Sequence, residues 1–287
     1  MNSIPFAFYD SVTRRMCTES LVRCCEMPVL IGTVASQNNQ KIGYEKITID
    51  NGRLVRTTYL TYCDNKEVAS INPNYRKFTS FCIKETGRQQ SIDADTIGAI
   101  EAYQKVAVID LHFFTPTIGH KLEECIASLR FVSMLYFSEG TADLIPRIMR
   151  KFVPRKTLTM LYFHGDYKFD EESALLLLDA LKQGQFNWAS LPSNSCLILK
   201  KIIAEWKKTP QKFIGKRVYS EMSLDNPSFQ KSIQRGNIRG FSEEEKRSQE
   251  LYYPHFNGKN LMISMNWKCG TIYWKCDDTE DIELLFA

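Results

Sequence analysis

The chain has 287 residues, a length that fits one large domain or two domains of ordinary size. Hydrophobic residues make up 44% and charged residues 24%, so the sequence can bury a sizeable core, which excludes disordered, fibrous and low-complexity proteins. The net charge of +4 is too small to indicate a nucleic-acid or membrane partner by itself.

Residues 1–27 are predicted to form two short helices. Pro5 fits the first turn of a helix, and the apolar residues Phe8, Val12 and Met16 follow at four-residue spacing. Two helices of this size cannot build a core alone. We therefore expect this segment to pack either on the body of the chain or on a partner, and the sequence leaves both alternatives open.

Residues 28–100 form a segment rich in β-branched and aromatic side chains. Residues 43–49 and 54–60 alternate between apolar and polar positions around the turn sequence Asp-Asn-Gly at 50–52, which predicts an antiparallel hairpin. A further strand is predicted at 78–83.

Residues 101–222 carry a recurring strand pattern. The sequence Met-Leu-Tyr-Phe occurs at 134–137 and again, 26 residues later, at 160–163. Similar strand-like segments are found at 109–113 and 186–190. This spacing lies within the period of about 20 to 29 residues that is typical of leucine-rich repeats.

Apolar residues at helical spacing predict helices between these strands, at 120–130, 171–182 and 196–206. A single strand-and-helix unit cannot close a core, so neighbouring units are expected to stack side by side. The predicted fold class is therefore α/β: an irregular leucine-rich-repeat-like solenoid of parallel strands backed by helices, with an N-terminal helical and β-hairpin segment.

Residues 223–287 are predicted to contain a linker, a short helix and a terminal hairpin. The helix would start at the capping sequence Ser-Glu-Glu-Glu of residues 242–245. The hairpin would join residues 260–267 to 271–276 and could cap the open end of the repeat stack.

Nine cysteines without Cys-x-x-Cys spacing favour reduced thiols over a disulfide framework or a structural zinc site. The N-terminal residues do not resemble a signal peptide, and no apolar run is long enough to span a bilayer. We expect a protein of the cytoplasm or nucleus that is not secreted, with no metal and no cofactor.

No complete catalytic motif is present. The sequence lacks a nucleophile elbow, a Walker loop and a glycine-rich dinucleotide turn. The best alternative is a hydrolase-type site at His164 and Asp166, which follow the second Met-Leu-Tyr-Phe strand. The favoured expectation assigns no catalytic residue.

A binding surface is the stronger expectation. If the leucine and phenylalanine residues of the strands point inward, alternation sends their neighbours to the opposite face. The residues expected there are Asp110, His112, Met134, Tyr136, Met160 and Tyr162. Tyrosine and methionine side by side are typical of recognition surfaces, although a face covered by the chain's own hairpins would instead be core.

The opening sequence, from Ile4 through Val12 to Cys25, followed by strand and helix units, resembles the large nematode family of F-box and FTH-domain proteins. In that family an N-terminal F-box docks on Skp1 in a cullin ubiquitin ligase, and the C-terminal body is thought to select substrates. The resemblance implies docking through the apolar positions of the first segment, which are Pro5, Phe6, Phe8 and Val12.

The resulting expectation is a non-enzymatic protein–protein interaction module, with an F-box-like adaptor function implied by the resemblance. Its partners would be proteins, Skp1 and a substrate among them, and neither nucleic acid nor membrane. The alternatives are the hydrolase-type enzyme and a purely structural or assembly protein.

Overall fold

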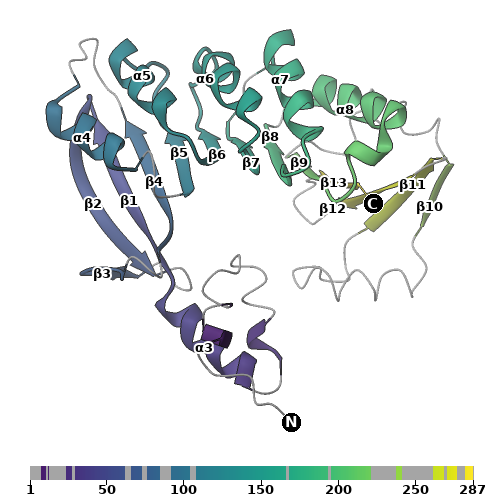
Figure 1. Ribbon diagram of the computed structural model, residues 1–287. Helices are drawn as coiled ribbons and strands as arrows, with labels where there is room; N and C mark the ends of the chain where they lie inside the picture. The colour runs from purple at the N-terminus through teal and green to yellow at the C-terminus, as the bar shows by residue number, and fades with distance from the viewer. Residues whose placement is uncertain are drawn as a thin grey trace. The chain divides into compact units, whose positions relative to one another are not determined.

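The computed structural model describes residues 8–10, 12, 24–27, 30–61, 66–72, 76–84, 92–103, 108–165, 168–192 and 195–220, and, as backbone strands only, residues 237–240, 261–267, 270–276 and 282–286. The chain divides into two compact units (Figure 1). Unit 1 comprises Met1–Leu111 and Gly119–Phe131, and unit 2 comprises His112–Ile118 and Val132–Ala287. Each unit is described by itself.

Unit 1 combines a mixed sheet with three described helices. Its elements are α3 (Leu30–Lys41), β1 (Gly43–Asp50), β2 (Arg53–Thr61), β3 (Glu67–Val68), β4 (Arg76–Lys84), α4 (Ala94–Tyr103), β5 (Val108–Phe113) and α5 (His120–Ser128). The last two residues of β5 belong to unit 2. The strands are ordered β5-β4-β1-β2-β3.

The predicted hairpin is confirmed in β1 and β2, which pair antiparallel from Gly43 opposite Thr61 to Asp50 opposite Arg53. Its turn holds Asn51 at φ 50° and Gly52 at φ 73°. Two successive positive φ angles match the twist of a hairpin, and asparagine and glycine adopt them most readily. The predicted strand 78–83 is also confirmed, within β4, which pairs in parallel with β1.

Helix α3 replaces the β structure expected after residue 28. Its sequence is poor in strong helix formers, so local propensity does not predict it. Tertiary packing stabilises the helix instead, because the side chains of Val34 and Ala35 are fully buried. Gly32 permits this packing, since a Cβ there would lie 2.0 Å from the Met27 carbonyl oxygen. Sequence patterns cannot report such tertiary contacts.

A charged cluster lies inside unit 1, where β1, β4 and α4 meet. The carboxylate of Glu45, whose side chain is 3% exposed, accepts a 2.7 Å hydrogen bond from Arg76. The Arg76 guanidinium also lies 5.6 Å from the centre of the Tyr103 ring. Burial, followed by the hydrogen bond with Glu45, raises the pKa of the Tyr103 phenol above its ordinary value. The phenol therefore stays neutral and Arg76 balances the buried carboxylate.

Unit 2 is built on parallel strands covered by helices. Its strands are β6 (Val132–Phe137), β7 (Met160–Phe163), β8 (Trp188–Leu191) and β9 (Arg217–Ser220), followed by β10 (Asn237–Gly240), β11 (Leu261–Trp267), β12 (Gly270–Cys276) and β13 (Ile282–Phe286). Its helices are α6 (Leu144–Phe152), α7 (Glu171–Leu181) and α8 (Cys196–Lys208), with short 3-10 turns η2 (Val153–Arg155) and η3 (Pro210–Lys212). Helices α6, α7 and α8 lie on one side of strands β6–β9 (Figure 1).

The core of unit 2 lies between these strands and helices. The rings of Phe113, Phe137 and Phe163 stack in sequence, with centroids 5.3 and 5.6 Å apart. The helices contribute apolar side chains at three- and four-residue spacing, Ile148 of α6 and Leu177 of α7 among them. Full burial of one such side chain contributes roughly 1.5–3 kcal/mol, so this layer is the main stabilising element of the unit.

The predicted leucine-rich-repeat-like solenoid is wrong. In a solenoid each strand pairs only with those of the adjoining units. Here β1 pairs in parallel with β4 although β2 and β3 come between them in the chain, and β9 pairs antiparallel with β13 from the end of the chain. The protein is an α/β fold with mostly parallel strands flanked by helices. The terminal hairpin itself is confirmed, as β11 and β12.

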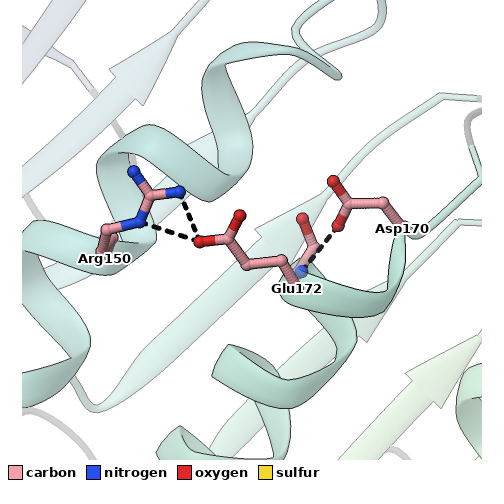
Figure 2. Close-up of polar contacts among 4 residues, drawn as sticks. Arg150, Asp170 and Glu172 are labelled. Carbon is pink, nitrogen blue, oxygen red and sulfur yellow. Dashed lines mark hydrogen bonds and ion pairs between the residues drawn. The ribbon is translucent and has the colours of Figure 1, made fainter.

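Helix α7 shows how the helices of unit 2 are fixed at their ends. The side chain of Asp170 accepts a 2.6 Å hydrogen bond from the backbone N–H of Ser173, which caps the helix (Figure 2). Arg150 of α6 donates to Glu172 in the first turn of α7, from Nε at 2.8 Å and from the guanidinium tip. The ion pair is 61% and 46% exposed, so the cap is expected to matter more than the pair.

Removal of Arg76 is expected to destabilise unit 1 much more than removal of Arg56. Arg76→Met leaves the Glu45 carboxylate buried without a cation, which costs about 3 kcal/mol. Arg56→Met breaks the Arg56–Glu67 pair, which is 62% and 57% exposed, and costs less than about 1 kcal/mol. Urea unfolding of both variants measures the difference, and equal losses would contradict it.

Asp170→Ala is expected to lower the free energy of unfolding by about 1 kcal/mol, because one N–H of α7 loses its acceptor. Glu172→Gln, which weakens only the exposed ion pair with Arg150, is expected to change it by less than about 0.5 kcal/mol. Thermal unfolding of the two variants beside the wild type is the measurement. A larger effect for Glu172→Gln would show that the pair, not the cap, holds this helix end.

Candidate binding surface

Strands β6 and β7 pair with their repeated sequences in register. Leu135 lies opposite Leu161 and Tyr136 opposite Tyr162. Both leucines are fully buried on the side of the helices. Because successive side chains of a strand point to opposite faces, the tyrosines lie on the face away from α6, α7 and α8, where they are half-buried.

A continuous row of aromatic rings crosses this face, which we call the ring row: His112, Tyr136, Tyr162 and Trp188. The centroid of Tyr136 lies 5.3 Å from that of His112 and 6.4 Å from that of Tyr162. Trp188 of β8 continues the row at 6.1 Å from Tyr162. Every ring of the row is half-buried, so each keeps part of its surface exposed.

The structure brings together most of the residues predicted for the binding surface. His112, Tyr136 and Tyr162 belong to the ring row, and Met134 and Met160, which pair with each other, lie beside it and are half-buried. Asp110 is the exception, because it is 8% exposed and belongs to unit 1. A binding role for these residues stays a prediction.

Three aromatic residues of this surface were missed from the sequence. Trp188 lies opposite Met160, so alternation along the predicted strand 186–190 could have identified it. Phe114 and His164 follow directly after β5 and β7 and flank Tyr136, with centroids 5.6 and 6.4 Å from its ring. Their positions depend on how the strands end, which alternation does not predict. Phe114 is 42% exposed.

The turn after β7 places His164 beside Tyr136. The backbone N–H of His164 donates a 2.8 Å hydrogen bond to the carbonyl of Phe137. Gly165 follows with φ 107°, and a Cβ there would lie 2.7 Å from the Cβ of Glu139. Glycine is therefore required both for the backbone angle and for the close approach of the turn that carries Glu139.

Two charged residues of opposite sign lie near the ring row. Glu139 is exposed and packs against the turn next to His164. Arg217 of β9 lies opposite Trp188 and is half-buried. Glu139 comes from the turn after β6 and Arg217 from β9.

Lys216 fixes the turn that precedes Trp188. It is 3% exposed, and its ammonium donates to the carbonyls of Gln183, at 2.6 Å, and of Gly184, at 3.2 Å, and to that of Phe186. Burial lowers the pKa of Lys216 from its ordinary value. The three carbonyl acceptors stabilise the charged form, so the lysine acts as a fixed donor that closes the turn before β8.

The expected adaptor-docking residues are only partly described. Phe8 is 54% exposed, with its ring 5.9 Å from that of Tyr9, and Val12 is half-buried. Pro5 and Phe6 lie outside the described residues. The docking role inferred from the F-box resemblance therefore stays a prediction.

The alternative hydrolase-type site is also only partly described. His164 is exposed and its ring stacks on Tyr136, whereas Asp166 lies outside the described residues. Among the described residues, no three His, Cys, Asp or Glu side chains gather as a metal site. Over the same part of the chain, no helix combines the length and the apolar character needed to cross a membrane.

Comparison with known proteins finds one weak structural similarity and no related sequence. No protein-family model and no curated protein matches the chain. Among solved structures, the chain is similar to a crystal structure of a PfkB family carbohydrate kinase from Listeria grayi, with 8% identity over 85% of this chain and 79% of that one. The TM-score is 0.23, too low to support an inference about this chain from that protein.

Two expectations are corrected at this point. We withdraw the expectation of a non-enzymatic protein: the similar structure is that of an enzyme, a likeness too weak to decide for or against catalysis in this chain. The weak likeness assigns no reaction to this chain. The leucine-rich-repeat-like description is likewise replaced by an α/β fold of mostly parallel strands. The F-box-like description and the ubiquitin-ligase adaptor role find no support in the comparisons.

Lys216→Met is expected to lower the free energy of unfolding by about 1–3 kcal/mol, because buried carbonyls lose their donor. The turn before β8 should loosen with it, so the fluorescence of Trp188 should change. Lys212→Met, an exposed lysine of η3, is the matched control and should leave both unchanged. Unaltered stability in Lys216→Met would contradict the positioning role.

Proposed function

We propose that this protein recognises another protein through the ring row. The observation that supports the proposal is the alignment of four aromatic rings on β5–β8, each in contact with the next, on the face of the strands away from the helices. Tyrosine and tryptophan contribute a large share of the affinity in protein interfaces, because they bury much surface and lose few rotamers.

The neighbouring methionines support the same function. Met134 and Met160 pair beside the ring row and are half-buried. An unbranched thioether side chain adapts its shape to a partner surface, whereas the rings supply fixed anchors. The combination of rigid and adaptable apolar groups is typical of recognition surfaces rather than of a fully covered core.

We place this interaction in the cytoplasm or nucleus. Cys82 is buried and Cys125 is half-buried, and both are thiols without a disulfide. Burial is also the main cause that raises the pKa of both thiols, which keeps them protonated. Reduced cysteines of this kind are typical of reducing compartments.

Tyr136→Ala combined with Tyr162→Ala is expected to reduce partner binding at least tenfold, because two aromatic anchors are each worth more than about 1 kcal/mol at an interface. The measurement is quantitative cross-linking and affinity capture with the intact chain, followed by binding assays with the purified partner. Circular dichroism checks that the variant is folded.

The matched control is Leu175→Ala, which removes an exposed apolar side chain from α7 on the other side of the strands. It should keep every partner that the wild type captures. If the double variant captures the same partners in the same amounts as the wild type, the ring row is not the recognition surface.

A further inference from the structure

The connections that lead from the helices of unit 2 back to its strands are basic. They are residues 153–159 between α6 and β7, 182–187 between α7 and β8, and 209–216 between α8 and β9. None of the three contains aspartate or glutamate. The small net charge of the whole chain therefore hides a local excess of positive charge. The cationic residues of these connections are Arg155, Lys156, Lys182, Lys212 and Lys216.

The three connections lie along one edge of the strands, which we call the basic edge. Strands β6 to β9 pair in parallel, so the chain enters β7, β8 and β9 at the same edge. The side-chain amide of Gln183 donates a 2.8 Å hydrogen bond to the carbonyl of Val153, which joins the first two connections. The ammonium of Lys216 joins the third connection to the second through the carbonyls of Gln183 and Gly184. These contacts fix the backbone of the edge before a ligand arrives.

The exposed lysines of the basic edge are not balanced by neighbouring carboxylates. Lys156 and Lys212 are exposed, and neither forms an ion pair with a carboxylate of the described residues. Lys182 shares the carboxylate of Glu205 with Lys208, at 3.0 and 3.4 Å. Helix C-termini attract cations, but this attraction falls off within the last turn. Because Lys156 and Lys212 lie beyond the ends of α6 and α8, the helix dipole does not account for them.

The backbone at Lys156 is the second observation that points to its side chain. Its φ of 57° and ψ of 36° lie in the left-handed region, which glycine adopts with less strain than lysine. In the connection after α8, the residue with a positive φ is Gly215, at 75°. A lysine in the turn after α6 brings no advantage to the backbone, which favours a role for its exposed ammonium group.

An acidic protein segment fits the basic edge better than a nucleic acid does. Unpaired bases stack on exposed aromatic rings, but Phe186 and Phe213, the aromatic residues of the connections, are fully buried. The exposed apolar surface of the edge comes from Ile214, which is 59% exposed and lies between Lys212 and Lys216 in the sequence. An aliphatic side chain among cations is complementary to a peptide that carries carboxylates around an aliphatic residue.

We propose that the basic edge of unit 2 binds an acidic segment of a partner protein, whose carboxylates pair with Lys156 and Lys212 and whose aliphatic residue packs on Ile214. The basic edge is formed by the connections that precede the strands, whereas the ring row lies on a face of the strands themselves. The inference therefore goes beyond the proposed function and does not depend on it.

Fluorescence anisotropy with labelled synthetic peptides tests the proposal on the intact chain. The probes are a peptide of eight glutamates around a central leucine, the same peptide with a central glycine, a peptide of eight lysines around a central leucine, and a ten-nucleotide polyuridine. We expect the glutamate–leucine peptide to bind at least tenfold more tightly than the lysine peptide and the polyuridine, and about threefold more tightly than the glutamate–glycine peptide. Raising the salt concentration from about 50 to about 200 mM should weaken it at least fivefold.

Three variants separate the basic edge from net charge. Lys156→Glu with Lys212→Glu should weaken the glutamate–leucine peptide at least tenfold. Lys168→Glu with Lys201→Glu is the matched control, because it changes the charge equally at two exposed lysines outside the basic edge, and should weaken the peptide less than threefold. Ile214→Ser should weaken the glutamate–leucine peptide about threefold and leave the glutamate–glycine peptide unchanged. Circular dichroism checks that each variant is folded.

The proposal is overturned if no glutamate peptide binds at millimolar concentration, or if the matched control weakens binding as much as Lys156→Glu with Lys212→Glu does. It is also overturned if polyuridine binds as tightly as the glutamate–leucine peptide, since the edge would then be a nucleic-acid surface. Tyr136→Ala with Tyr162→Ala should bind the glutamate–leucine peptide as the wild type does. Loss of partner capture in that variant concerns the ring row alone, so the failures of the two proposals are distinguishable.

Discussion

The register between two neighbouring parallel strands is the constraint on which the rest of unit 2 depends. Because β6 and β7 pair residue for residue over the same Met-Leu-Tyr-Phe sequence, each side chain stacks on its own copy. A slip of one residue would turn Leu135 and Phe137 toward the face away from the helices and place Tyr136 under the helices. The apolar layer forbids that slip, and the ring row on the other face follows from the same register.

A few polar groups then fix the places where the chain turns between these elements. Lys216 closes the turn before β8 by donating to backbone carbonyls, and Asp170 caps α7. In unit 1, Arg76 neutralises Glu45 between β1 and β4. Each group satisfies a partner that would otherwise be buried without one, which costs more than the hydrogen bond itself contributes. The strands are thus held by apolar burial and their connections by a few polar contacts.

Sequence patterns predicted the parts of the fold that depend on neighbouring residues. The hairpin of β1 and β2 follows from its Asp-Asn-Gly turn and alternation, and the in-register pairing of β6 with β7 follows from the repeated sequence. Alternation also placed Tyr136 and Tyr162 on the correct face. Trp188 was within reach of the same reasoning, because the strand that carries it had been recognised.

The pairings between strands that are distant in the chain could not be predicted from the sequence. Nothing in the sequences of β1 and β4 indicates that these two strands pair in parallel, although β2 and β3 come between them in the chain. Nor does the sequence indicate that β13 pairs with β9. The solenoid prediction failed at these pairings, because a repeated sequence pattern does not indicate which strands pair beyond the first and last repeat. Helix α3 was missed for a related reason, as its stability comes from burial of Val34 and Ala35 rather than from its own propensity.

The rigidity of the ring row bears directly on how it could bind. Side chains that must be ordered on binding lose roughly 0.5–1.5 kcal/mol each in conformational entropy. In this row Tyr136 is already in contact with four other rings, those of His112, Phe114, Tyr162 and His164, so its orientation is restricted before any ligand arrives. Most of the free energy of burying its exposed surface therefore remains available as affinity.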